Sequence, residues 1–127
     1  MLPALSDIAE REYVLLTTFR RTGVPVATPV WIVRDGEHLL ITTGADSGKV
    51  KRLRHTARIT LAPCDARGRV TEDIEPVAAI AIVDASGPTM ERVDRALAGK
   101  YGLKHKMIRA SQRLKRTTSG SVALVVT

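Results

Sequence analysis

Aromatic residues and cysteine are scarce in this chain of 127 residues. Phenylalanine, tyrosine and tryptophan together make up 3% of the sequence, and Cys64 is the single cysteine. So few aromatic rings leave little material for a platform on which successive nucleic-acid bases stack. A lone cysteine excludes an internal disulfide and suits a reducing compartment.

Long apolar runs are also missing. The longest, such as residues 77–83, are far too short to cross a lipid bilayer. The N-terminal residues lack the basic start and following apolar stretch of a signal peptide. We therefore expect a cytoplasmic protein that does not insert into membranes.

Acidic residues are the minority charge. Lys and Arg number 20 against 13 Asp and Glu, which gives a net charge of +7. This balance predicts an anionic partner without distinguishing nucleic acid, a membrane surface or a small phosphate-bearing molecule. The length, with 44% hydrophobic residues, fits a single globular domain over residues 1–127.

Motifs for metal binding and nucleophilic catalysis are absent from the sequence. His38, His55 and His105 lie far apart, Cys64 has no CxxC partner, and no GxSxG motif occurs. The sequence therefore predicts no metal site, and it assigns no catalytic residue.

The distribution of apolar residues predicts mostly short strands with inserted helices. Six segments have strand character: residues 13–19, 24–34, 39–43, 58–62, 77–83 and 121–126. Helices are expected over residues 3–11, with Ser6 or Asp7 as the cap, and over 47–54, 89–101 and 103–116. Without a regular alternation of strand and helix, this order favours an antiparallel barrel of the α+β class.

The segment from Thr42 to Arg54 carries the first candidate site. Its Gly-Lys pair is not a phosphate loop, because the glycine spacing is wrong and Val50 stands where Ser or Thr should bind magnesium. A turn followed by a helix start with nearby lysines nevertheless suits an anion, although Asp46 would repel it unless it caps the helix or faces away. A solvated basic helix is the alternative, and both interpretations are open.

Residues 27–31 form the second candidate site. A proline within a strand frees a backbone carbonyl, which can then hydrogen-bond the edge of a flat heterocycle. The alternative is an edge strand that its prolines protect from aggregation, with Trp31 in the core. The basic helix over residues 103–116 is open to three interpretations: a nucleic-acid surface, a field that steers an acidic ligand, or a solvated face.

Three runs in this order resemble a known family: TPVW (28–31), TGADSGKVKRLR (43–54) and LAPCDARGR (61–69). They are similar to the pyridoxamine-phosphate-oxidase-like split β-barrels, and within these to the actinobacterial branch of deazaflavin (coenzyme F-420)-dependent enzymes. The resemblance covers residues 13–69 and extends more loosely to residue 102. It implies a six-stranded antiparallel split β-barrel of the FMN-binding type with short flanking helices. It also implies a homodimer with cofactor sites at the subunit interface.

The resemblance further implies which residues bind the cofactor. Lys49 matches the lysine that holds the phosphate, with Lys51 and Arg52 as helpers. The strand that carries TPVW lies along the ring system, and Thr42 and Thr43 flank it. The expected cofactor-binding residues are Thr28, Pro29, Val30, Trp31, Thr42, Thr43, Ser47, Gly48, Lys49, Val50, Lys51 and Arg52. The chain departs from the family pattern at Ile32 and at residues 55–58, which leaves ring stacking and substrate choice open.

The function expected from this resemblance is an F-420-dependent oxidoreductase that transfers hydride to a small electron-poor molecule. One alternative keeps the barrel and exchanges the cofactor for FMN or a tetrapyrrole. Another is a non-enzymatic nucleic-acid-binding module, against which the scarcity of aromatic residues weighs.

Overall fold

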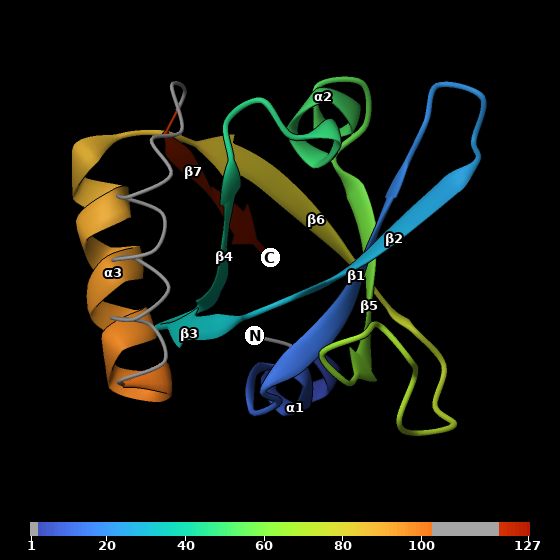
Figure 1. Cartoon of the computed structure of the whole chain (residues 1–127), viewed down its shortest axis with the longest axis horizontal. Helices are drawn as coiled ribbons and strands as arrows, with labels where there is room; N and C mark the ends of the chain where they lie inside the picture. The colour runs from blue at the N-terminus through green and yellow to red at the C-terminus, as the bar shows by residue number, and fades with distance from the viewer. Residues whose placement is uncertain (1–2, 103–119) are drawn as a thin grey trace.

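A curled antiparallel sheet of seven strands forms the body of the molecule (Figure 1). The computed structural model describes residues 3–102 and 120–127. The strands are β1 (Tyr13–Phe19), β2 (Pro25–Val30), β3 (Val33–Asp35), β4 (His38–Gly44), β5 (Arg58–Cys64), β6 (Val77–Asp84) and β7 (Ser121–Val126). The helices are α1 (Pro3–Ala9), α2 (Gly48–Leu53) and α3 (Gly87–Tyr101).

The order of the strands explains why the sheet closes on itself. The order is β2-β1-β5-β6-β7-β4-β3, and all neighbouring strands are antiparallel. The two edge strands, β2 and β3, are consecutive in the chain, with only Trp31 and Ile32 between them. The sheet must therefore curl until its edges approach, which makes a split barrel.

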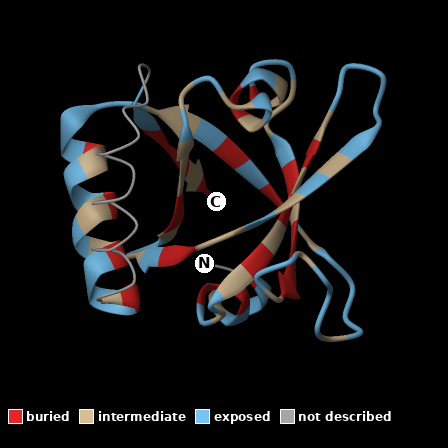
Figure 2. Ribbon diagram, in the orientation of Figure 1, coloured by how far each residue is buried: buried red, intermediate tan, exposed pale blue. Residues whose placement is uncertain are grey.

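The interior of the barrel is filled by every second residue of the strands. In β1 the buried positions alternate with partly exposed ones, and Leu16 pairs with Leu61 of β5 on the inner face. Figure 2 shows the buried residues along the inner side of the curled sheet. The hydrophobic core inside the barrel also includes Ile8 of α1 and Leu53 of α2, so these two helices close the barrel.

The outer faces of the two halves of the sheet differ. Helix α3 covers the outer face of β7, β4 and β3, where Val93 and Leu97 pack on Val33 and Leu40. No described helix covers the outer face of β2, β1, β5 and β6 (Figure 1). Ile82 of β6 is 62% exposed there, which leaves an apolar face without a partner among the described residues.

The predicted fold class is confirmed, with two local corrections. The expected strand over residues 24–34 is two strands, so the sheet has seven strands where six were expected. The break falls at Trp31 and Ile32, where the chain crosses between the sheet edges, and not at the prolines. Helix α1 begins at Pro3, so Ser6 and Asp7 lie inside it and neither caps it. The helix expected over residues 103–116 lies outside the described residues.

Candidate functional site

Helix α2 follows the turn after β4 and closes one end of the barrel (Figure 1). Ser47 caps it, because its Oγ accepts a hydrogen bond from the N–H of Val50 at 3.4 Å. The Oγ1 of Thr43 donates to the same Ser47 oxygen at 3.2 Å, which joins the end of β4 to the cap. Val50 and Leu53 are buried beneath the helix, so the intervening basic residues face outward or sideways.

Arg52 is held in place between α2 and the sheet. Its Nε donates to the Oγ1 of Thr18 at 2.6 Å, and the Thr18 side chain is fully buried in β1. A Cβ atom on Gly48 would lie 2.6 Å from Nη1 of Arg52. The guanidinium therefore folds back over the first turn of α2, where only a glycine leaves room for it.

Lys49 and Arg52 form a positive site without a counter-charge among the described residues. Burial lowers the pKa of Lys49, and the nearby charge of Arg52 lowers it further. Burial also lowers the pKa of Arg52, and the charge of Arg20 adds to that effect. No carboxylate forms a salt bridge with either side chain within residues 3–102 and 120–127. Crowded cations of this kind favour a bound anion, which removes their mutual repulsion.

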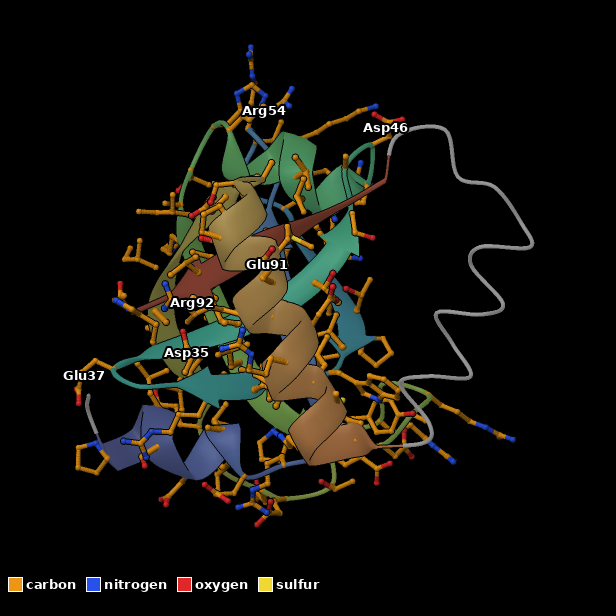
Figure 3. The ribbon with its side chains drawn as sticks, turned by 90° about the vertical axis from the view of Figure 1, so that its left-hand side faces the viewer. Asp35, Glu37, Asp46, Arg54, Glu91 and Arg92 are labelled. Carbon is orange, nitrogen blue, oxygen red and sulfur yellow. The ribbon has the colours of Figure 1, made fainter. Side chains whose placement is uncertain are left out.

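Asp46 does not occupy the cap position. Ser47 provides the capping oxygen, and Asp46 is exposed in the turn before it. In Figure 3 it lies at the edge of the molecule, apart from Arg54 at the end of α2. The sequence left open whether this carboxylate caps the helix, and the structure assigns that role to its neighbour.

The residues expected along the ring system form a second group on β2. The side chain of Thr28 lies on the inner face with its pairing partner Leu16, whereas Pro29 faces outward beside Leu15. The Oγ1 of Thr28 is buried without a hydrogen-bond partner among the described residues. Across the outer face, Gly68 leaves a Cβ position 3.4 Å from Cδ of Pro29, so the loop after β5 lies against this strand.

Trp31 lies at the far end of β2 from α2. Its ring stacks on Tyr101 with the centroids 4.2 Å apart and the planes 8° from parallel. Tyr13 lies beside it at 6.4 Å. Trp31 is partly exposed and packs under the last turn of α3.

The structure thus brings one part of the predicted set together at α2. Thr43 and the residues from Ser47 to Arg52 share that end of the barrel. The side chain of Val50 belongs to the core, and Thr42 lies on the face of β4 that α3 covers, paired with Ala123. The sequence did not identify Thr18 as a residue of this site. Its only indication there is a hydroxyl group at an inward position of an apolar strand.

A hollow of about 510 Å³ opens at the other end of the uncovered sheet face. Its lining includes Tyr13, Pro63, Cys64 and Thr71. Burial raises the pKa of the Cys64 thiol, and the charge of Asp65 raises it further. The sulfur therefore remains a protonated thiol near neutral pH and is a poor nucleophile.

Metal-binding clusters and membrane-spanning helices are both absent from the part of the chain that the structure describes. Within it, no three His, Cys, Asp or Glu side chains are grouped closely enough to hold a metal ion. None of the described helices has the length and apolar character needed to span a membrane.

The family model described as pyridoxamine 5'-phosphate oxidase matches residues 2–124. No curated protein matches the chain. Among solved structures, the chain is similar to the haem storage protein from Vibrio cholerae, with a TM-score of 0.68 and 11% identity over 98% of this chain and 87% of that one.

Two other solved structures carry names of flavin-type proteins. An F-420 reductase is 19% identical, with a TM-score of 0.57 over 95% of this chain and 90% of that one. A pyridoxamine 5'-phosphate oxidase-related, FMN-binding protein from Nostoc punctiforme is 12% identical, with a TM-score of 0.59 over 98% and 80% of the two chains. At these identities the likeness establishes the fold. Together with the family match over nearly the whole sequence, it shows that the chain belongs to the pyridoxamine 5'-phosphate oxidase family.

Proposed function

We propose that the protein binds a flavin-type cofactor and transfers hydride through it to a small electron-poor molecule. The observation that carries the proposal is the pair Lys49 and Arg52, two partly buried cations without a described counter-charge in a chain of this family. The deazaflavin F-420 is the proposed cofactor and FMN the alternative. An F-420 reductase and an FMN-binding protein among the structurally similar proteins support these two cofactors as candidates.

The residues present fit such a cofactor. Lys49 and Arg52 would hold its phosphate, with Lys51 adding charge from the exposed side of α2. The outward-facing edge of β2 at Pro29 would lie along the ring. When bound, the cofactor supplies the hydride chemistry, while the chain supplies binding, orientation and charge.

The uncovered sheet face supports a homodimer. Ile80 and Ile82 are 45% and 62% exposed on the outer face of β6, beside the small side chain of Ala78. A self-complementary contact with a second copy would cover this face in the way that α3 covers the other half. A cofactor bound along β2 would then lie close to the partner. With a single cysteine held as a thiol, we place this dimer in the reducing cytoplasm.

The direct test is titration with the cofactor, followed by deazaflavin fluorescence, with FMN in a parallel series. Saturable binding at micromolar concentrations is expected, and Lys49→Ala should weaken it by roughly 1.5–3 kcal/mol. Arg95→Ala is the matched control, since it removes the same charge from an exposed position of α3. Equal affinity in the wild type and Lys49→Ala would show that the phosphate is held elsewhere.

A tetrapyrrole is the second candidate ligand, because the haem storage protein shares this fold. Adding haemin and recording the visible spectrum separates the two proposals. A sharp, saturable haem absorption band together with no response to deazaflavin or FMN would replace the oxidoreductase proposal.

A further inference from the structure

Two adjoining hollows lie at the end of the molecule away from α2. The larger is the hollow of about 510 Å³ that Tyr13 lines, and we call it the Tyr13 hollow. The smaller, of about 370 Å³, is lined by Glu10, Glu12, Lys100 and Tyr101, and we call it the Tyr101 hollow. Glu12 lines both, so the two are neighbours. Figure 1 shows α1 and the loop after β5 at the opposite end of the barrel from α2.

Most of the aromatic rings of the chain gather beside these hollows. The sequence has one tryptophan, two tyrosines and one phenylalanine, and all but the phenylalanine lie here. Trp31 stacks on Tyr101, and the ring of Tyr13 lies beside Trp31 with the two planes 56° apart. In a chain so poor in aromatic residues, this concentration gives both hollows an aromatic wall.

Packing of α3 on the sheet accounts for only two of the three rings. Trp31 and Tyr101 belong to the cluster beneath α3, and the hydroxyl of Tyr101 is bonded to the backbone of Ile32 and Glu12. Tyr13 belongs to neither buried cluster. Its hydroxyl forms no hydrogen bond with any residue within 3–102 and 120–127. The phenol of Tyr13 can therefore contact a ligand in its hollow.

The basic groups of the two hollows are already paired with protein atoms. The ammonium of Lys100 donates to the carbonyl oxygens of Ala9, Arg11 and Ile32, which uses all three of its N–H bonds. The guanidinium of Arg11 forms a salt bridge with Glu72. An anionic ligand would therefore find no unpaired cation among the described residues of this end.

Carboxylates outnumber cations in the lining. Glu10, Glu12 and Asp65 line the hollows against two basic residues, although the whole chain has a net charge of +7. Asp65 is paired with Arg69, but the side chain of Glu10 forms no hydrogen bond or salt bridge with a described residue. Burial lowers the pKa of Lys100, and the charges of Glu10 and Glu12 oppose that shift, so both carboxylates lie near its ammonium.

We propose that the two hollows together bind a flat aromatic molecule that carries a positive charge, such as an N-alkylated nitrogen heterocycle. Its ring would lie in the Tyr13 hollow against Tyr13 and Pro63, with the charge directed toward Glu10 and Glu12. Such a ligand gains ring packing, cation–π attraction and attraction to the carboxylates together. A volume of about 510 Å³ suits a small molecule. The site is separate from Lys49 and does not require the proposed cofactor.

The single tryptophan reports on binding in the full-length protein without added cofactor. The indole N–H resonance of Trp31 is followed by NMR during titration with N-methylquinolinium, neutral quinoline and anionic naphthoate. These probes share a flat two-ring framework and differ in charge. Saturable shifts are expected, with N-methylquinolinium bound about fivefold or more tighter than either of the others. Equal affinities for the three probes, or no saturation with N-methylquinolinium, would overturn the proposal.

Removal of one carboxylate tests the source of the charge preference. Glu10→Gln keeps the shape and should weaken N-methylquinolinium binding about three- to fivefold, while quinoline binding stays within about twofold of the wild type. Glu91→Gln is the matched control, because it removes the same charge from an exposed position of α3. Equal weakening in both variants would overturn the proposal, since net charge alone would then explain the preference.

Removal of the aromatic wall tests the location. Tyr13→Leu should weaken both N-methylquinolinium and quinoline, because both probes use the same ring contact. Phe19→Leu is the control, since Phe19 is a partly exposed ring at the other end of β1. Thermal unfolding checks that both variants are folded. Unchanged affinity in folded Tyr13→Leu, or the same loss in Phe19→Leu, would overturn the placement.

A last variant separates this inference from the proposed function. Lys49→Ala lies at the other end of the barrel and should leave N-methylquinolinium affinity within about twofold of the wild type. Loss of binding in that variant would place the probe at the cofactor site and would overturn the inference. Failure of the cofactor titration alone would leave the aromatic-cation site intact.

Discussion

The hydroxyl of Tyr101 accepts a hydrogen bond from the backbone N–H of Ile32 at 3.1 Å. It donates in turn to the carbonyl of Glu12 at 2.7 Å, while the ammonium of Lys100 donates to the carbonyl of Ile32 at 2.6 Å. Ile32 is fully buried at the break between β2 and β3, where the sheet ladder leaves its backbone unpaired. The last residues of α3 thus satisfy the polar groups at the corner through which the barrel closes.

Replacing Tyr101 by phenylalanine should destabilise the protein by about 1–3 kcal/mol. The ring would still stack on Trp31, but the buried N–H of Ile32 would lose its acceptor. Urea unfolding followed by tryptophan fluorescence measures the change, with Tyr13→Phe as the control because Tyr13 is less buried. A Tyr101→Phe variant as stable as the wild type would show that water or another group accepts the hydrogen bond from the N–H of Ile32.

Stability should fall at high pH because of the same residue. Burial raises the pKa of Tyr101 to about 12 from 10.0, so the folded protein retains a proton that the unfolded chain releases. The stabilisation is complete below pH 10 and is lost as the pH rises from about 10 to about 12. It amounts to about 3 kcal/mol.

Unfolding free energies of the wild type and Tyr101→Phe, measured from pH 8 to pH 12, isolate this contribution. The difference between them should shrink above pH 10, since the variant lacks the titrating hydroxyl. A difference that stays constant with pH would contradict the raised pKa of Tyr101. Absorbance at 295 nm should also show one late tyrosine ionisation that Tyr101→Phe removes.

Gly48→Ala should reduce anion affinity while leaving stability nearly unchanged. The new methyl group would meet Nη1 of Arg52 at 2.6 Å, and a flexible guanidinium can move away at little cost. Its displacement would remove one cation from the site beside Lys49. Phosphate or cofactor titration and thermal unfolding test the two halves of this prediction. Gly99→Ala in α3, where a Cβ meets nothing, is the matched control.

Unaltered affinity in the Gly48→Ala variant would show that the folded-back position of Arg52 is not needed. Much lower stability would instead show that the first turn of α2 depends on glycine itself. The two measurements together separate a role in binding from a role in folding.

The sequence predicted the elements well where local patterns decide them. Tyr13–Phe19 is β1 at the expected bounds, and Gly102 ends α3 with a positive φ of 56° as its position suggested. The break at Ile32 was missed because its cause is remote: the hydroxyl and ammonium groups that satisfy it lie 69 and 68 positions away. Nothing in the local sequence indicates that contact.

The same distinction holds for the candidate site: its local features were predictable from the sequence, and its long-range contacts were not. The basic helix start with a serine cap was readable from Ser47 to Arg52, because capping and helical spacing are local. The contact of Arg52 with Thr18 and that of Arg21 with His55 each join residues 34 positions apart. They exist because the first hairpin and α2 meet at one end of the barrel, which only the closed sheet determines.

The uncovered sheet face gives the last prediction. Ile82→Glu places a charge at a position that is 62% exposed in the single chain, so the monomer should lose little stability. In a homodimer that position would be buried, and the charge would have to be removed from water without a partner. Light scattering with size-exclusion chromatography should therefore show a dimer for the wild type and a monomer for Ile82→Glu. Ile74→Glu is the control, since Ile74 is 46% exposed in the loop before β6. If both variants remain dimeric, the second copy must bind another face, and a cofactor along β2 would have no partner subunit beside it.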